Sequence, residues 1–136
     1  MTPAQMAALH ARCFTVPRPW LAQEFAATLS DPLCFTLFES GGFLIGRAVA
    51  DEAEILTLAV DPDARRRGVA TLLVQGFLAK AKTQRAASVF LEVASNNDPA
   101  ISLYLQAGFA KVGLRRGYYA HPNVAAIDAV VMSRAV

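Results

Sequence analysis

The sequence is poor in residues that hold metals or form disulfides. Its 136 residues include two cysteines, two histidines and one tryptophan. Cys13 and Cys34 lie in apolar surroundings at a spacing that matches no zinc or redox motif, so we expect buried, reduced thiols, with a disulfide as the alternative. A metal site built on His10 and His121 would need further ligands that we do not find. We therefore expect no metal.

The chain also lacks a large excess of charge of either sign. Thirteen basic and eleven acidic residues give a net charge of +2, which is too small a field to favour nucleic acid or an anionic membrane as partner. No apolar run approaches the length that crosses a bilayer, and the N-terminal segment "MTPAQMAALHARCF" lacks the basic start and continuous apolar run of a secretory signal. We expect a cytoplasmic protein that binds neither nucleic acid nor membrane.

What the sequence does contain is apolar residues, at 54% of the chain. This content and length fit one α/β domain over residues 1–136, with no linker, repeat or low-complexity segment. Capping and periodicity predict helices over residues 2–13, 19–30, 68–83 and 98–107. Thr2 and Gln5 form a predicted capping box, Asp98 is a predicted N-cap, and Leu72 is predicted on the apolar face of the third helix. Strands are predicted over 34–40, 43–50, 53–60, 88–93, 109–114 and 125–133, the first two joined by Gly41 and Gly42.

The segment "AVDPDARRRGVATLLVQGFLAK", residues 59–80, joins a predicted strand to a predicted helix. A helix N-terminus has unpaired N–H groups and a partial positive charge, and Gly68 and Ala70 would let an anion approach them closely. Three arginines precede Gly68. The patterns G-x-x-x-x-G-K-[ST] and G-x-G-x-x-G are both absent, so two interpretations remain: a solvated charge run at an ordinary helix, or a phosphate-binding turn.

Two blocks of sequence favour the second interpretation. Arg65-x-x-Gly68-x-Ala70 resembles the acyl-CoA signature of the GNAT N-acyltransferase superfamily. The segment "LEVASNNDPAISLYLQAGFAKVGLRRGYY", residues 91–119, is similar to the corresponding part of RimI-like ribosomal-protein alanine N-acetyltransferases. The resemblance implies a mixed sheet in which an antiparallel meander precedes a central parallel pair around an acyl-CoA cleft. The strand that usually opens the family's fold is not evident here.

The resemblance also implies which residues bind acetyl-CoA, the acetyl donor. The turn and first helical residues would hold the pyrophosphate, the end of the preceding strand would meet the pantetheine and the thioester oxygen, and an asparagine would contact the cofactor arm. These positions are Leu58, Ala59, Val60, Arg65, Arg66, Arg67, Gly68, Val69, Ala70, Thr71 and Asn97. For Asn97 the alternative is turn chemistry ahead of a helix.

The resemblance assigns Glu92 as the general base, acting through water, and Tyr104 as the acid that protonates the departing thiolate. Glu92 alternates with apolar neighbours in its strand, which would place it in a partly dehydrated cleft and raise its proton affinity. A phenol keeps its proton at neutral pH and can donate it. The alternatives are a carboxylate on a solvated strand face and a half-buried helix tyrosine.

Residues 115–119 are predicted to form a late loop. The resemblance makes Arg116, Tyr118 and Tyr119 part of an acceptor groove, whereas the alternative is a surface turn that covers the core edge. The function implied is transfer of acetyl from acetyl-CoA to a protein N-terminal α-amine, with a ribosomal-protein alanine as the leading acceptor. Acetylation of a small amine and acyl-CoA binding without turnover are the alternatives. We expect a monomer or a weak homodimer.

Overall fold

The structure is a computed structural model that describes residues 1–15, 17–121 and 124–136. In chain order these residues form α1 (Pro3–Cys13), α2 (Ala22–Leu29), β1 (Cys34–Glu39), β2 (Gly42–Val49), β3 (Glu52–Val60), a 3-10 turn η1 (Pro62–Ala64), α3 (Val69–Thr83), β4 (Ser88–Ala94), α4 (Asp98–Gln106), β5 (Ala110–His121) and β6 (Val124–Ala135). The strands make one mixed sheet in the order β1-β2-β3-β4-β6-β5. The predicted fold class is confirmed.

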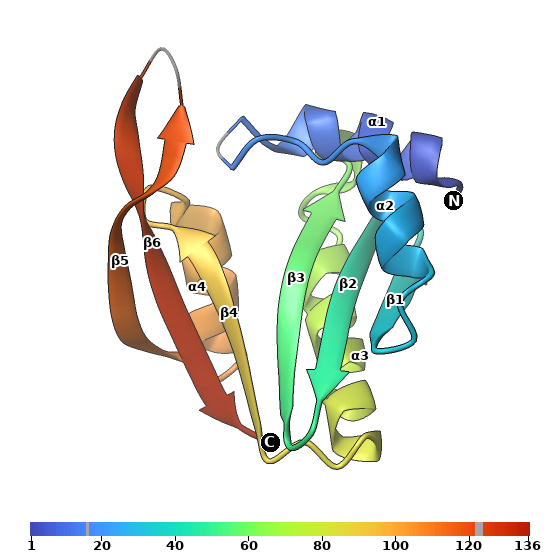
Figure 1. Ribbon diagram of the computed structural model, residues 1–136, viewed down its shortest axis with the longest axis vertical. Coiled ribbons are helices and arrows are strands. Elements are labelled where there is room, and N and C mark those ends of the chain that lie inside the picture. The colour runs from blue at the N-terminus through green and yellow to red at the C-terminus, as the bar shows by residue number, and fades with distance from the viewer. Residues whose placement is uncertain (16, 122–123) are drawn as a thin grey trace.

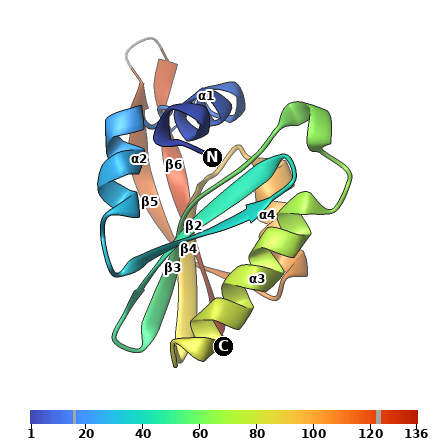
Figure 2. The ribbon, with the colours of Figure 1, turned by 90° about the vertical axis from the view of Figure 1, so that its right-hand side faces the viewer.

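Helices cover both faces of the sheet (Figures 1 and 2). On one face α3 and α4 pack over a large core whose centre includes Phe77, Leu91 and Met132. On the other face α1 and α2 cover only the first half of the sheet, where Phe25 and Phe43 form a smaller core. The second half of that face is therefore not covered by either of these helices.

The helices begin close to where capping chemistry predicts, with two corrections. Thr2 and Gln5 form the expected capping box of α1. The second helix starts at Ala22 rather than near residue 19, and Trp20 lies before it and packs on Phe25 with ring centroids 5.1 Å apart. In α3 the residue Leu72, predicted on the apolar face, is 50% exposed, because it lies outside the stripe that the buried residues of this helix form.

The antiparallel meander of β1, β2 and β3 is as predicted, but its first turn is shifted by one residue. Gly42 already belongs to β2 and pairs with Glu39, so the turn residues are Ser40 and Gly41. Gly41 has a φ of +87°, and a Cβ added there would lie 2.6 Å from the Cβ of Ala64. Glycine at position 41 therefore lets the hairpin pass close to the turn that follows β3.

A bulge in β3 changes the alternation of its side chains: odd-numbered residues face the α3 and α4 core before the bulge and the α1 and α2 core after it. Ile45 pairs with Thr57 and Gly46 pairs with Ile55, which leaves Leu56 as an extra residue in β3. Before the bulge Ile55 packs with the α3 and α4 core, and after it Ala59 packs with the α1 and α2 core. The bulge was not predicted, since the segment "AEILTLAV" carries no glycine or other local signal.

The central parallel pair is short. β3 and β4 pair only from Glu52 with Ser88 to Ile55 with Leu91. Beyond that point β4 continues against β6 and β3 continues against β2, so the two strands diverge, as Figure 1 shows. The divergence opens the middle of the sheet at the end where β3 leads into the arginine turn.

The last two strands are longer than predicted, and the predicted late loop is wrong. Residues 115–119 lie within β5, which pairs with β6 through irregular registers between Arg115 and Tyr119 and again before His121. Gly117 has a φ of +59°, and its N–H donates a 2.7 Å hydrogen bond to the carboxylate of Asp128. These irregularities let a strand accommodate a sequence whose glycine and charges resemble those of a loop.

No helix among the described residues is long and apolar enough to span a membrane.

Candidate active site

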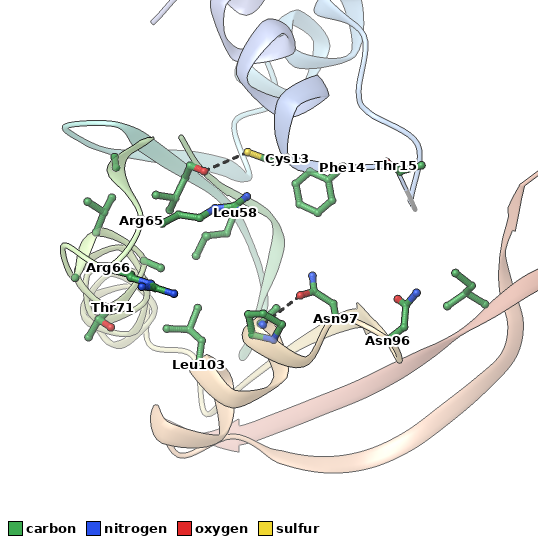
Figure 3. A pocket seen from close by; sticks show the side chains of 18 residues that line it. Cys13, Phe14, Thr15, Leu58, Arg65, Arg66, Thr71, Asn96, Asn97 and Leu103 are labelled. Atoms are coloured by element: carbon green, nitrogen blue, oxygen red, sulfur yellow. Dashed lines mark hydrogen bonds between the residues drawn. The ribbon is translucent and has the colours of Figure 1, made fainter. Parts of the chain in front are cut away.

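A cavity of about 970 Å³ lies where the sheet opens, between the start of α3, the end of β3 and the start of α4. Figure 3 shows Arg65, Arg66 and Thr71 at one end of it and Asn96 and Asn97 at the other. The residues that line it are Cys13, Phe14, Thr15, Leu58, Val60, Ala64, Arg65, Arg66, Gly68, Val69, Ala70, Thr71, Asn96, Asn97, Pro99, Ala100, Leu103 and Ile127.

The N-terminus of α3 opens into this cavity without a side-chain cap. Gly68 is the N-cap, with a left-handed φ of +75°, and within the described part of the chain no side chain caps the first-turn N–H groups. By contrast, α1 and α4 are capped by the side chains of Thr2 and Asn97. A Cβ added at Gly68 would meet no atom within 4 Å, so the space beside the turn belongs to the cavity. The turn can therefore receive an anion on free N–H groups.

The turn is held in place by contacts with α1. The Asp61 carboxylate accepts a 2.9 Å hydrogen bond from the N–H of Asp63, and Arg12 of α1 donates to the same carboxylate at 3.0 Å. These bonds lower the pKa of Asp61, with the backbone hydrogen bond contributing most. The Cys13 thiol donates to the carbonyl of Val60 at 3.3 Å. Both cysteines are free and partly buried.

Most of the predicted cofactor residues face the cavity. Those that line it are Leu58, Val60, Arg65, Arg66, Gly68, Val69, Ala70, Thr71 and Asn97. Two do not line it. The Ala59 side chain packs in the smaller core on the opposite face, as alternation along β3 requires, and Arg67 lies on the exposed side of the turn.

The main chain of β3 is open on the side of the cleft. After Ile55 it has no parallel partner in β4, so backbone groups in Leu56 to Val60 that point toward β4 are not engaged in that ladder. Leu58 lines the large cavity and also the smaller one next to it. A backbone N–H at this point could stabilise an oxyanion, and that role stays a prediction.

A second cavity of about 120 Å³ lies deeper in the opening and contains both predicted catalytic residues. Glu92, Tyr104 and Tyr119 line it. Five residues line both cavities: Phe14, Leu58, Asn97, Ala100 and Leu103. The structure thus brings the predicted base and acid together beside the end of the larger cavity.

Glu92 forms an ion pair that the sequence did not predict. Its side chain is 18% exposed, and its Oε1 lies 2.9 Å from Nε of Arg115. The guanidinium of Arg115 in turn lies over the ring of Tyr118, 5.1 Å from the centroid. The positive charge of Arg115 therefore lies directly beside the carboxylate of the predicted base. The contact occupies one carboxylate oxygen, and no hydrogen bond or ion pair from residues 1–15, 17–121 or 124–136 engages the other.

Three further titratable groups surround Glu92. Burial, followed by the charge of Glu92, raises the pKa of Glu54 on the neighbouring strand. Burial and the same charge raise the pKa of Tyr119 to about 12. Tyr104 is 7% exposed, and burial raises its pKa well above the ordinary value. Both phenols therefore hold their protons at neutral pH, as a general acid must.

Asn97 has a structural role as well as a place in the cavity wall. Its side-chain oxygen accepts a 3.3 Å hydrogen bond from the N–H of Ala100, which makes Asn97, and not the predicted Asp98, the N-cap of α4. The turn chemistry considered as the alternative is thus present. Contact with a cofactor arm through the amide nitrogen stays a prediction.

The predicted acceptor residues do not all reach the site. Tyr119 lines the small cavity, whereas Tyr118 is half exposed and reaches the site through Arg115. Arg116 is exposed on β5 and lines neither cavity. Their roles in binding an acceptor stay predictions.

Sequence reasoning missed the contribution of α1 and of β3 to the small cavity. His10, Phe14 and Thr57 all line it, although His10 and Thr57 are 47 residues apart in the chain. Neither residue lies in a motif, so only the packing of α1 across the sheet brings them to the site. Among the described residues, no three His, Cys, Asp or Glu side chains are grouped as metal ligands would be.

Comparison with known proteins matches the sequence of this chain to one family. The model of the acetyltransferase (GNAT) family matches residues 4–109. The chain is 34% identical over 119 residues to a [ribosomal protein bS18]-alanine N-acetyltransferase of Escherichia coli K12, covering 85% of this chain and 80% of that protein. It is 36% identical over 137 residues to the N-alpha-acetyltransferase RimI of Mycobacterium tuberculosis, covering 94% of this chain and 83% of that protein.

The fold is similar as well. The crystal structure of the ribosomal-protein-S18-alanine N-acetyltransferase from Escherichia coli superposes with a TM-score of 0.85 at 29% identity, over 99% of this chain and 87% of that one. The likeness therefore extends through β5 and β6, beyond the residues that the family model matches.

Proposed function

The chain belongs to the GNAT acetyltransferase family, and on that premise we propose that it transfers the acetyl group of acetyl-CoA to the α-amine of a protein N-terminus. The observation that carries the proposal is the junction of the two cavities: a large one that begins at uncapped helix N–H groups, and a small one that contains Glu92 and Tyr104. The relatives that act on ribosomal protein bS18 make an N-terminal alanine the leading acceptor.

The larger cavity suits the donor substrate. A pyrophosphate carries several negative charges, which the free N–H groups of Val69, Ala70 and Thr71 and the side chains of Arg65 and Arg66 can balance. The rest of the cavity, toward Leu58 and Leu103, is more apolar and suits the pantetheine arm. This orientation directs the thioester toward the small cavity.

In the small cavity the residues can carry out direct transfer within a ternary complex. Glu92, through a water molecule, takes a proton from the incoming ammonium. The neutral amine then attacks the thioester carbonyl, forming the C–N bond, while β3 main-chain N–H groups stabilise the oxyanion. When the C–S bond breaks, Tyr104 donates its proton to the thiolate of coenzyme A, and the proton released by the nitrogen restores the phenol through solvent.

An α-amine demands less of this base than a lysine side chain. With a pKa near 8, about one-tenth of α-amino groups are neutral at pH 7, whereas a lysine near 10.4 is neutral about once in a few thousand molecules.

Two other functions remain as alternatives. A small-molecule amine could take the place of the N-terminus without any change in the chemistry of the site. An acyl-CoA-binding module without turnover would bind the cofactor but release no thiol, and the presence of both Glu92 and Tyr104 in one cavity speaks against it.

A thiol-release assay distinguishes these functions. Peptides that differ only in their first residues, including one that begins with alanine, are compared with a panel of small amines at equal concentration. We expect kcat/KM to be highest for one class of N-terminal residue. Higher values for a small amine than for every peptide would replace the proposed acceptor, and binding of acetyl-CoA without thiol release on any acceptor would contradict catalysis.

A further inference from the structure

A buried hydrogen-bond chain reaches the small cavity from α1. His10 of α1 is 1% exposed, and its Nδ1 lies 3.0 Å from the backbone N–H of Trp20. Its Nε2 lies 2.8 Å from Oγ1 of Thr57 on β3. The ring of Phe14 stacks on the imidazole at 4.3 Å between centroids, which fixes its plane.

The backbone N–H fixes the tautomer of His10. An amide N–H can only donate, so Nδ1 must accept and carries no proton. Burial lowers the pKa of His10 to about 4, so the ring is neutral at physiological pH, with its one proton on Nε2. Nε2 therefore donates to Thr57, and the Thr57 oxygen accepts.

Thr57 is then left with a hydroxyl proton to donate. Among the described residues no group accepts a hydrogen bond from this hydroxyl, although Thr57 is 8% exposed and lines the small cavity. The hydroxyl oxygen already accepts a hydrogen bond from His10, which restricts the direction in which the hydroxyl proton can point. Its hydrogen-bond partner must therefore be an acceptor atom in the cavity.

The position of Thr57 indicates which ligand that is. Thr57 follows the bulge residue Leu56 in the diverging part of β3, so its side chain lies on the α1 face of the sheet. It lines the small cavity and not the larger one, which separates it from the donor substrate. An N-terminal peptide offers one strong neutral acceptor close to its amine, the carbonyl oxygen of its first residue.

We propose that Thr57 is an acceptor-binding residue whose hydroxyl donates to the first carbonyl oxygen of the N-terminal peptide, and that His10 is the positioning residue that fixes the direction of this bond. The inference rests on the proposed function. The hydrogen bond from Thr57 would make the enzyme select amines whose nitrogen is two bonds from a carbonyl carbon. Simple alkyl amines have no such carbonyl.

The test uses the full-length enzyme and two acceptors. One is a peptide that begins with alanine, and the other is the same peptide with its first peptide bond replaced by an E-alkene, which keeps the shape and removes the carbonyl. Thr57→Val removes the hydroxyl at nearly constant volume. We expect kcat/KM for the normal peptide to fall about tenfold, the value of one good hydrogen bond, and to stay unchanged for the alkene peptide.

Matched variants separate this role from a structural one. Thr57→Ser should keep most of the activity on the normal peptide, and His10→Gln, which can place an amide donor near Thr57, should keep more activity than His10→Leu. Thr36→Val, the same change in β1, should alter neither acceptor. The KM for acetyl-CoA should be unchanged throughout.

Three results would overturn the inference. An equal loss with both acceptors would mean that Thr57 acts elsewhere, and full activity of Thr57→Val on the normal peptide would mean that it makes no such bond. Nitrogen NMR that finds the His10 proton on Nδ1 would remove the directional reasoning. If the wild-type enzyme acetylates neither peptide, the proposed function itself fails. If the wild-type enzyme is active and Thr57→Val is equally active, only the inference about Thr57 fails.

Discussion

His10 should make the folded chain lose stability as the pH falls below neutrality. Burial lowers its pKa from 6.5 to about 4, and the nearby charge of Glu24 opposes that shift only in part. Between these two pH values the unfolded chain binds a proton that the folded chain does not bind. The contribution of His10 to the free energy of unfolding must therefore decrease as the pH falls through this window and level off below it.

The two pKa values give the size of the effect. Between pH 7 and pH 5 the difference in proton binding amounts to about 2 kcal/mol. The ion pair of Arg18 with Glu24 contributes little in this range. The Glu24 carboxylate has a pKa of about 2 in the folded chain and an ordinary pKa of 4.5, so between pH 5 and pH 7 it is mostly charged in both the folded and the unfolded chain. His10 is thus expected to dominate the difference between the wild type and a variant that lacks only this imidazole.

Urea unfolding at pH 7 and pH 5 measures this directly for the wild type and for His10→Gln. Glutamine is neutral at both pH values, and His121 is present in both proteins, so its contribution cancels in the comparison. We expect the wild type to lose about 2 kcal/mol more than the variant. Equal losses in the two proteins would refute the claim that His10 is buried as a neutral donor to Thr57.

Two further predictions concern the cofactor turn and the base. Gly68→Val should weaken acetyl-CoA binding at least about tenfold, because it adds bulk where the anion approaches the α3 N–H groups; Gly108→Val imposes similar strain at a φ of +92° far from the cavity and should keep the affinity measured by calorimetry. Arg115→Met should lower kcat by about tenfold at unchanged acetyl-CoA affinity, because Glu92 loses the guanidinium that holds one of its carboxylate oxygens. Lys111→Met removes the same charge elsewhere on β5 and should leave kcat in place, so an equal loss in the two variants would contradict the pairing.

The sequence predicted what depends on local chemistry. Thr2 with Gln5 located a helix start, the apolar period located α3, and Gly68 after three arginines located the turn that lines the large cavity. Each of these signals lies within a few residues of the structure that it predicts. The resemblance to a family supplied Glu92 and Tyr104, which the structure brings to one small cavity.

The features that the sequence could not predict depend on contacts between distant segments. The bulge at Leu56 is set by the register of β2 against β3, and it decides that Thr57 faces α1. The β5 strand continues through Gly117 because Asp128 on β6 accepts its N–H. The pairing of Arg115 on β5 with Glu92 on β4 reaches across β6, which lies between these strands, and has no counterpart in local sequence.

The central claim is that Glu92 and Tyr104 transfer protons to and from an amine and a thioester that meet between the two cavities. The most direct measurement is kcat for thiol release by Tyr104→Phe at saturating acetyl-CoA and saturating peptide, together with the acetyl-CoA affinity of the same variant. Loss of the phenolic proton should lower kcat on the order of 100-fold while the affinity stays the same. A kcat within about twofold of the wild type would contradict the assignment, because Tyr104 could then not be the general acid that protonates the thiolate.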